Sequence, residues 1–443
     1  MSKSFKIAAI TVTAAMLLAF ALIAYFTISG IIHPNISIKE VEICNITKQQ
    51  ALERLKRQIE PAIANSFIVL NSNTGKWKLN YPKAGVSYKY DEAVNEAYIL
   101  KDSGNIFTKV FRAINSFESN RSIDIPYTCD TASINNFIDI VAQDVDKPYV
   151  DATIKLVNGK FIITDEIPGK FLNKQKVYDL IIQQLENATG ATIELPIEGI
   201  SPRLKKSDLL NIKDKLGEFS TQFNASDNDR VSNLSIATRN ASDVLILPDE
   251  VFSFSKIVGP RLEKYGFKMA KIIMNNQYVS GIGGGICQVS STLYNAVLYS
   301  NLEIVQRVNH SLPSTYIEIG RDATISGDYI DLKFKNNTGY PIYVYGEMKG
   351  NKVKFTVYGK NDIPDRFVEI KTEMVLKTEP TTEIIEDPTL PEGTVVEERK
   401  ASPSYTVKSY KVIKERGKED IIVPLYTDLY PLVNGIKRVG IKK

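Results

Sequence analysis

The sequence has few of the residues that build covalent cross-links or metal centres: its 443 residues include three cysteines and two histidines. Three cysteines do not make the dense disulfide framework of small exported domains. Cysteine and histidine spacing typical of zinc sites is also absent, so we predict no structural metal and no cofactor. Cys44 and Cys129 are able to pair, which leaves Cys287 as an odd thiol that is either reactive or partnered.

An excess of charge of one sign is also missing. The chain has 55 Lys and Arg residues against 51 Asp and Glu residues, a formal net charge of +4. A nucleic-acid-binding chain concentrates its basic residues on one face, so we expect no nucleic-acid partner. The glycine cluster at Gly283, Gly284 and Gly285 is not followed by the Gly-Lys-Ser/Thr of a phosphate-binding loop, which argues against phosphate binding there.

A long uncharged run, Ile7 to Ile32, lies near the N-terminus. It has the length of a membrane-spanning helix. Lys3 and Lys6 precede it, which by the positive-inside rule places the N-terminus in the cytoplasm and the body outside the cell. A cleaved signal peptide is the alternative, but its apolar region is normally shorter. We expect residues 1–35 to be a cytoplasmic stub and a single transmembrane anchor, with an extracellular body.

Residues 36–200 contain two copies of one pattern. Gly75-Lys76-Trp77 and Gly159-Lys160-Phe161 each have a second glycine ten residues on, at Gly85 and Gly169, so the copies are offset by a constant 84 residues. Each motif follows a helical and a strand-like run and precedes another helical run. The Asn-Gly pair before Lys160 favours a β-hairpin. The region is therefore predicted to be a duplicated α+β unit.

The rest of the chain is predicted to form an α+β domain over residues 201–362 and an all-β module over residues 363–443. A helix is expected from Ser207 to about Phe219. Alternating apolar residues from Ile330 onward predict an antiparallel meander packed on the preceding helix. From about Lys377 the sequence is rich in Thr, Glu and Pro, which indicates an extended or linker-like segment. The module that follows is either a spacer or a ligand-binding domain.

The richest stretch is Gly281 to Asp322. The glycine cluster leads into Cys287, and apolar residues at three- and four-residue steps predict that Cys287 opens a helix with one buried face, off which the thiol lies. A thiol in the first turn faces the positive end of the helix, which favours the thiolate. His310 is the only histidine expected in the folded body, because the other one, His33, lies just beyond the N-terminal apolar segment. Cysteine, histidine and aspartate in this order indicate a nucleophile, a base and the residue that orients the base.

Further residues of this stretch are candidates for substrate binding. They are Gly283, Gly284, Gly285, Gln288 and Arg321. Backbone N–H groups between Gly285 and Gln288, or the Gln288 side chain, could form an oxyanion hole. Asp328 or Asp331 could replace Asp322 as the orienting carboxylate. The competing interpretation is an inert buried cysteine beside a surface histidine, with glycines that allow close backbone packing.

The motifs GGGICQVSSTLYNAVL, VQRVNHSLPSTY, GRDATISGDYIDLKFKN and LPDEVFSFSKIVG, between about Phe219 and Val357, resemble those of the VanW family. The duplicated region resembles the peptidoglycan-binding domain that often precedes VanW domains. The tail, with EDPTLPEGTVVE and SYTVKSYKVI, is similar to a five-glycine-type module of bacterial surface proteins, proposed to bind N-acetylglucosamine-containing sugars. Ala401-Ser402-Pro403 stands where that module usually has glycines.

The resemblance implies a wall-associated protein of a Gram-positive-type envelope, with peptidoglycan or another wall glycan or peptide as partner. It brings no established reaction, leaves the oligomeric state open, and connects the chain to vancomycin resistance through the family name alone. Two functions are expected from these observations. One is a cysteine-dependent amidase or transpeptidase-like enzyme acting on wall peptides. The other is a non-catalytic peptidoglycan-binding or scaffolding protein.

Overall fold

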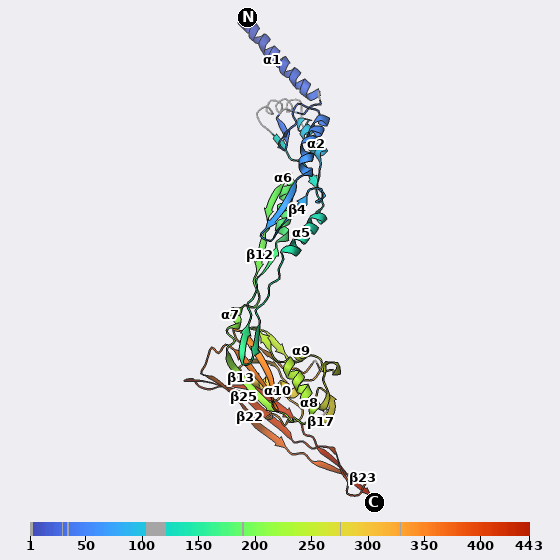
Figure 1. Cartoon of the computed structure of the whole chain (residues 1–443), viewed down its shortest axis with the longest axis vertical. Helices are drawn as coiled ribbons and strands as arrows, with labels where there is room; N and C mark the ends of the chain where they lie inside the picture. The colour runs from blue at the N-terminus through green and yellow to red at the C-terminus, as the bar shows by residue number, and fades with distance from the viewer. Residues whose placement is uncertain are drawn as a thin grey trace. The chain divides into compact units, whose positions relative to one another are not determined.

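The computed structural model describes residues 3–28, 30–32, 35–102, 121–187, 190–274, 276–327 and 329–443. The chain folds into two compact units of mixed α+β structure (Figure 1). The first unit contains Met1–Val150 and Pro168–Ser201, and the second contains Asp151–Ile167 and Pro202–Lys443. His33 and Asp328 lie outside the described residues.

The chain begins with helix α1, Lys3–Ile28, which covers most of the uncharged run. We expected this segment to be a transmembrane anchor. Within the part of the chain that the structure describes, no helix is both long enough and apolar enough to cross a membrane.

The region from α2 to α6 repeats the order helix, hairpin, helix. Helix α2 begins at Thr47, whose hydroxyl accepts from the Gln50 N–H while the Gln50 side chain accepts from the Thr47 N–H, a capping box. The elements of the first copy are α2 (Lys48–Ala64), β3 (Phe67–Ser72), β4 (Gly75–Asn80) and α3 (Tyr90–Asp102). Those of the second are α5 (Thr131–Val145), β8 (Ile154–Val157), β9 (Lys160–Ile163) and α6 (Lys174–Asn187).

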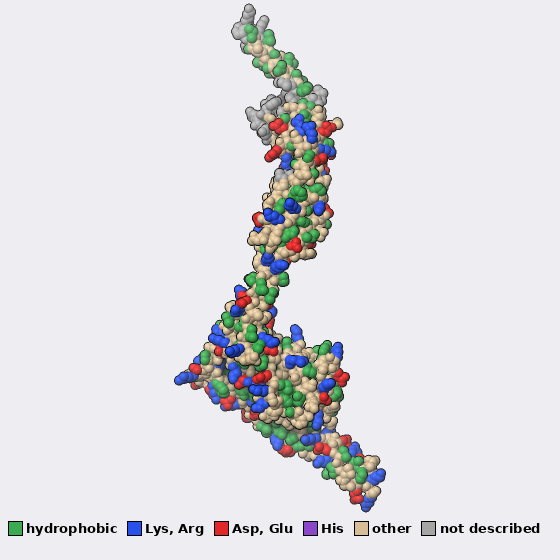
Figure 2. All heavy atoms as spheres, viewed as in Figure 1, with side chains coloured by type: hydrophobic (Ala, Val, Ile, Leu, Met, Phe, Trp, Pro, Cys, Tyr) green, Lys and Arg blue, Asp and Glu red, His purple; other side chains and the backbone are tan. Residues whose placement is uncertain are grey.

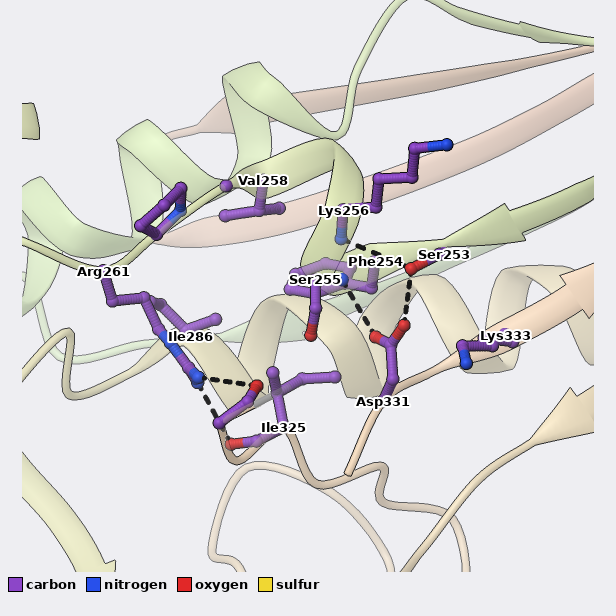
Figure 3. A pocket seen from close by; sticks show the side chains of 13 residues that line it. Ser253, Phe254, Ser255, Lys256, Val258, Arg261, Ile286, Ile325, Asp331 and Lys333 are labelled. Atoms are coloured by element: carbon purple, nitrogen blue, oxygen red, sulfur yellow. Dashed lines mark hydrogen bonds between the residues drawn. The ribbon is translucent and has the colours of Figure 1, made fainter. Parts of the chain in front are cut away.

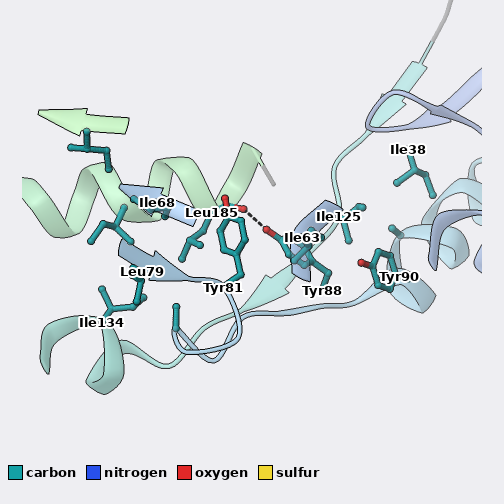
Figure 4. Packing of buried hydrophobic residues seen from close by; sticks show 14 of the residues in the cluster. Ile38, Ile63, Ile68, Leu79, Tyr81, Tyr88, Tyr90, Ile125, Ile134 and Leu185 are labelled. Carbon is teal, nitrogen blue, oxygen red and sulfur yellow. Dashed lines mark hydrogen bonds between the residues drawn. The ribbon is translucent and has the colours of Figure 1, made fainter. Parts of the chain in front are cut away.

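The two copies share one hydrophobic core in the first unit. Strand β11 (Ala191–Glu194), which follows α6, pairs in parallel with β3 and completes the sheet β11-β3-β4. Ile68 and Leu79 from the first copy and Ile134 and Leu185 from the second belong to the same buried cluster (Figure 4). The hydroxyl of Tyr88 donates to the Leu185 carbonyl at 2.7 Å. Short strand pairs complete this unit: β1 (Ile36–Ile38) with β2 (Val41–Glu42) and β6 (Arg121–Ile123), β5 (Ser87–Tyr88) with β7 (Tyr127–Thr128), and β10 (Gly169–Leu172) with β12 (Ile197–Ile200).

One hairpin of the region 36–200 does not belong to the first unit, so the two units do not divide simply at residue 200. Asn158 and Gly159 both adopt positive φ, 50° and 75°, and form the tight turn between β8 and β9. This hairpin belongs to the second unit, where the Phe161 ring packs edge-on against Tyr343 and Tyr358 at centroid distances of 5.6 and 5.2 Å. The second copy is therefore divided between the two units, although the sequence repeat is continuous.

The second unit is built on an antiparallel sheet in the order β13-β21-β20-β14, on which helix α10 packs. Val289, Leu293 and Val297 of α10 and Phe355 of the sheet are completely buried. The helix predicted from Ser207 to Phe219 is wrong: α7 is a single turn and β13 follows it. The bounds are α7 (Lys206–Leu209), β13 (Asp214–Gln222), α8 (Asn228–Asn240), β14 (Val244–Ile246), α10 (Ile286–Tyr299), β20 (Ile342–Lys349) and β21 (Lys352–Gly359).

The second unit also contains a smaller sheet, in the order β15-β19-β18, and a hairpin of β16 and β17. The hairpin leads directly into the glycine cluster. The bounds are β15 (Val251–Ser253), α9 (Phe254–Val258), the 3-10 helix Glu263–Tyr265, β16 (Met269–Met274), β17 (Gln277–Ile282), β18 (Glu303–Gln306) and β19 (Lys333–Lys335).

The C-terminal region is all-β and belongs to the second unit. The segment from about Lys377, predicted to be extended or linker-like, is extended and forms strands of two sheets, β22-β25-β26 and β23-β27-β24. Their bounds are β22 (Arg366–Thr378), β23 (Thr382–Pro391), β24 (Val395–Arg399), β25 (Ser404–Glu415), β26 (Ile421–Tyr430) and β27 (Gly435–Lys442). Basic and acidic side chains intermingle on the face of the second unit shown in Figure 2, as the small net charge suggests.

Candidate active site

The glycine cluster fixes the start of helix α10. Gly283 and Gly285 have φ values of +79° and +106°, which side chains rarely adopt, and Gly285 is the N-cap. A Cβ on Gly284 would lie 2.6 Å from the backbone of Ala270 and Lys271 in strand β16. These three glycines therefore allow a tight turn and a close backbone approach. The helix begins at Ile286, so Cys287 is its second residue and lies in the first turn.

The Cys287 thiol is half-buried beside the chain at Ile325. The Ile325 N–H donates to Sγ at 3.4 Å. The first N–H groups of a helix lack intrahelical acceptors, and no acceptor among the described residues takes up the N–H of Cys287. Burial by itself raises the pKa of Cys287, but the hydrogen bond and positive charge of His310, with weaker help from Ile325 and Arg261, lower it overall.

The imidazole of His310 lies between Cys287 and Asp322. Asp322 Oδ2 forms a short hydrogen bond with His310 Nδ1 and accepts the His310 backbone N–H at 2.6 Å. Because Nδ1 is held by the carboxylate, Nε2 is the ring nitrogen left for the thiol. The side chain of His310 is only 5% exposed, so the expectation of a surface histidine is wrong.

The pKa shifts of Cys287, His310 and Asp322 reinforce one another. Burial favours the neutral imidazole, but Asp322 and Cys287 outweigh it and raise the pKa of His310 well above its usual value. Burial also opposes ionisation of Asp322, whose pKa is nevertheless lowered by His310, Arg307 and Tyr430. The directions of the three shifts favour thiolate, imidazolium and carboxylate together.

Asp322 is held from its other side by the C-terminal module, which the sequence did not indicate. Tyr430 of strand β26 donates its hydroxyl to Asp322 Oδ1 at 2.5 Å and accepts the Gly320 N–H at 2.9 Å. Arg307 donates to Asp322 Oδ1 at 3.3 Å and to the carboxylate of Asp428, also in β26, at 2.5 and 2.6 Å. Tyr430 is completely buried, and Arg307 and Asp428 nearly so.

Tyr316 is a further residue that the sequence did not indicate. Burial, and then the negative charge of Cys287, raise the pKa of the Tyr316 hydroxyl, which also interacts with Ser314 and Ser291. The hydroxyl therefore stays protonated close to the thiol. Its place in the motif with His310 was visible in the sequence, but a tyrosine six residues after a histidine has no specific chemical meaning by itself.

Two predicted binding residues serve packing instead. Gln288 is 1% exposed, and its amide group donates to Thr221 Oγ1 and the Gln222 carbonyl at 3.0 and 2.7 Å. Its side chain is thus committed to β13 and is not an oxyanion donor.

Arg321 is also engaged away from the thiol. It donates to Asn295 Oδ1 at 2.8 Å and to the Tyr299 hydroxyl at 2.9 Å, and its guanidinium lies over the Phe219 ring.

Asp331, the alternative orienting carboxylate, lies elsewhere. It accepts from the Ser253 hydroxyl at 2.6 Å and from the Ser255 and Leu332 N–H groups at 2.9 and 2.8 Å.

All three cysteines are free thiols, so Cys44 and Cys129 do not pair. No cluster of three or more His, Cys, Asp or Glu side chains suited to a metal ion occurs within the described ranges.

A cavity of about 580 Å³ opens beside the first turn of α10 (Figure 3). Ile286, which precedes Cys287, and Ile325, whose N–H contacts the thiol, both line it. The side chains of Arg261 and Ser255 point into the same space. The other lining residues are Ser253, Phe254, Lys256, Val258, Gly259, Pro260, Gly327, Asp331 and Lys333.

Comparison with known proteins places this site in a recognised family. Residues 229–358 match the family model described as "VanW like protein". Uncharacterized protein YoaR of Bacillus subtilis is 38% identical over 179 residues, which are 40% of this chain and 59% of that protein. Vancomycin B-type resistance protein VanW of Enterococcus faecalis is 32% identical over 129 residues, 28% of this chain and 47% of that protein. Residues 229–358 therefore resemble a VanW domain.

Cys287, Arg307, His310, Tyr316 and Asp322 all lie inside the VanW domain, whereas Asp428 and Tyr430 lie outside it. Residues 77–194 match a second model, described as "Putative peptidoglycan binding domain", which covers much of the duplicated region. The IgA1 protease G5 domain structure matches 18% of the chain and 94% of its own length, with 23% identity and a TM-score of 0.14. The chain spans about half the length of the curated relatives that it matches.

Proposed function

We propose that this VanW-family protein is a cell-envelope protein that binds peptidoglycan and cleaves or transfers an acyl group of wall peptides at Cys287. The observation that carries the catalytic part is the buried chain of contacts from Cys287 through His310 to Asp322. A structural cysteine needs neither an imidazolium nor a carboxylate behind that imidazolium. A cysteine nucleophile needs both, the first to form the thiolate and the second to orient the ring.

The proposed reaction uses each group once in each half. The Cys287 thiolate attacks an amide carbonyl, and the His310 imidazolium gives its proton to the leaving amine as the C–N bond breaks, so a thioester forms. Neutral His310 then takes a proton from water or from an acceptor amine, which attacks the thioester and releases the thiolate. Water gives hydrolysis, and an amine gives transfer. The Cys287 N–H and the Tyr316 hydroxyl are the donors proposed for the oxyanion.

Binding to peptidoglycan is supported by the family model that matches residues 77–194. The test is sedimentation of the full chain with purified peptidoglycan at low and high salt. Removal of residues 36–200 is a poor test, because it would also remove the hairpin Asp151–Ile167 from the second unit. Retention of the whole protein in the supernatant at low salt would refute the binding assignment.

We further propose that helix α1 attaches the protein to the cell membrane, with the body outside. The support is the uncharged run behind Lys3 and Lys6, together with apolar side chains such as Leu17 and Leu18 that are 66% and 67% exposed. Protease added to wall-stripped cells is expected to digest the body. Carbonate extraction is expected to leave the protein in the membrane fraction, and its release would overturn this part of the proposal.

A non-catalytic wall-binding function is the second candidate. The observation in its favour is that the Cys287 thiol is partly covered, with the Ile325 backbone and the Tyr316 hydroxyl beside it. Peptidoglycan fragments incubated with the protein distinguish the two functions. Hydrolysis should release new free amino groups, whereas transfer should form new peptide cross-links without a net change in amino groups. Mass spectrometry of the fragments should find one of these products with the natural protein and neither with Cys287→Ser. Absence of both products with the natural protein would leave binding as the function.

A further inference from the structure

The cavity beside Cys287 carries an excess of positive charge. Lys256, Arg261 and Lys333 line it, against one carboxylate, Asp331. Asp331 is held by a hydroxyl and two backbone N–H groups, so its hydrogen-bonding capacity is used by neutral donors. In the described part of the chain, none of the three basic residues forms an ion pair with a carboxylate.

The best-placed cation is Arg261. Its Nη1 and Nη2 donate to the carbonyls of Ile325 and Gly327 at 3.3 and 3.2 Å (Figure 3). Two carbonyl oxygens fix the guanidinium but do not neutralise it. Ile325 is also the residue whose N–H contacts the thiol. Arg261 is therefore a charge oriented next to the reacting sulfur by the same loop that contacts that sulfur.

The cavity also holds an unused hydrogen-bond donor. The Ser255 Oγ atom is buried and has no partner among the described residues, although its backbone N–H is bonded to Asp331. A buried hydroxyl without a partner costs free energy. A ligand oxygen in the cavity would satisfy it. The volume, about 580 Å³, lies within the range of small-ligand sites.

We propose that this cavity binds a carboxylate of the acyl donor, next to the carbonyl that Cys287 attacks. The site combines the guanidinium of Arg261, the hydroxyl of Ser255 and the ammonium of Lys333, donors suited to a carboxylate. The proposal deepens the function given above and rests on it. It names the substrate class as peptides that carry a free carboxylate close to the scissile amide, in preference to their amidated forms.

Two alkylating reagents that differ by one charge provide the test. Iodoacetate and iodoacetamide are applied to the full chain, and the rate at Cys287 is measured by mass spectrometry, with Cys44 of the same molecules as the reference thiol. The rate with iodoacetate divided by the rate with iodoacetamide does not depend on the fraction of thiolate, because that fraction affects both rates equally. This ratio should be higher at Cys287 than at Cys44. Arg261→Gln should reduce it about threefold, the effect of one charge at contact distance in a partly solvated site.

The matched control is Lys335→Gln. Lys335 lies in the same strand as Lys333, and its replacement by Gln removes the same single positive charge. It pairs with Asp249 and does not line the cavity. Its ratio should equal that of the natural protein, while Lys333→Gln should lower the ratio as Arg261→Gln does. Equal ratios at Cys287 and Cys44, unchanged by Arg261→Gln, would overturn the proposal while leaving Cys287 as a reactive nucleophile.

Protection experiments identify the anion. N-acetylglycine should slow the reaction of Cys287 with iodoacetamide, and N-acetylglycinamide, its neutral match, should not. Stronger protection by inorganic phosphate would replace the carboxylate assignment with a phosphate site. If Cys287 reacts with neither reagent, the proposed nucleophile fails, and the cavity is then tested by thermal stabilisation. N-acetylglycine should stabilise the natural protein and not Arg261→Gln, and stabilisation of neither would overturn the carboxylate site.

Discussion

Replacing Tyr430 by Phe tests whether the C-terminal module is part of the site. The Tyr430 hydroxyl is completely buried and makes two hydrogen bonds, to the Asp322 carboxylate at 2.5 Å and from the Gly320 N–H at 2.9 Å. Tyr430→Phe keeps the ring and removes both bonds. A hydrogen bond to a charged group contributes about 1.5–3 kcal/mol, and an unpaired buried N–H costs a further amount of about 1 kcal/mol or more.

We therefore expect a loss of about 3 kcal/mol in the free energy of unfolding of the second unit. A change of 1 kcal/mol moves the Tm of a domain of this size class by about 2–4 °C, so Tm should fall by roughly 6–12 °C. The pH profile of Cys287 alkylation should change little, because Asp322 keeps its bonds to His310 and Arg307. Calorimetry and alkylation across pH measure the two effects separately.

Tyr426→Phe is the matched control. Tyr426 lies in the same strand and stacks over Arg307 at 5.0 Å, yet its hydroxyl makes no contact with Asp322. Removal of the Tyr426 hydroxyl should lower Tm by a few degrees at most. Equal Tm values for the two variants, or no change with Tyr430→Phe, would show that the module does not hold the orienting carboxylate.

Three further outcomes are expected. His310→Gln should move the alkylation profile of Cys287 to higher pH, because the imidazolium that lowers the pKa of the thiol is gone while burial still raises it. Each unit of increase in that pKa should slow alkylation at neutral pH about threefold, because a more nucleophilic thiolate offsets part of the tenfold loss in thiolate concentration. An unchanged midpoint would mean that no Cys–His pair exists. Gly284→Ala should destabilise the second unit by about 3 kcal/mol because its Cβ would meet the backbone of strand β16, whereas Gly339→Ala, where nothing lies within 4 Å, should be nearly neutral; similar melting curves would contradict this. In residues 36–200 expressed alone, the first unit should fold around its own core, while the hairpin Asp151–Ile167 loses the partners that it has in the second unit. Protection of the hairpin amides from hydrogen exchange in that fragment would disprove the division.

The sequence by itself determined the features that depend on neighbouring residues. Asn158-Gly159 can adopt two positive φ values in succession, and this fixes a hairpin turn wherever the hairpin packs. The glycines before Cys287 permit a turn that side chains would block, and the apolar spacing after them defines a helix with one buried face. The position of the thiol in the first helical turn follows from these local rules alone.

Only the tertiary structure decided what depends on distant partners. Local signals predicted a helix up to about Phe219, but β13 is a strand because its pairing with β21, more than a hundred residues away, outweighs local propensity. The pairing of the extended segment after Lys377 into sheets also depends on distant partners. Asp322 is bonded to Tyr430 across 108 residues, and Arg307 to Asp428 across 121. No periodicity records such contacts, because they arise when two segments, each unremarkable in sequence, exclude water from a shared carboxylate and so make its hydrogen bonds strong.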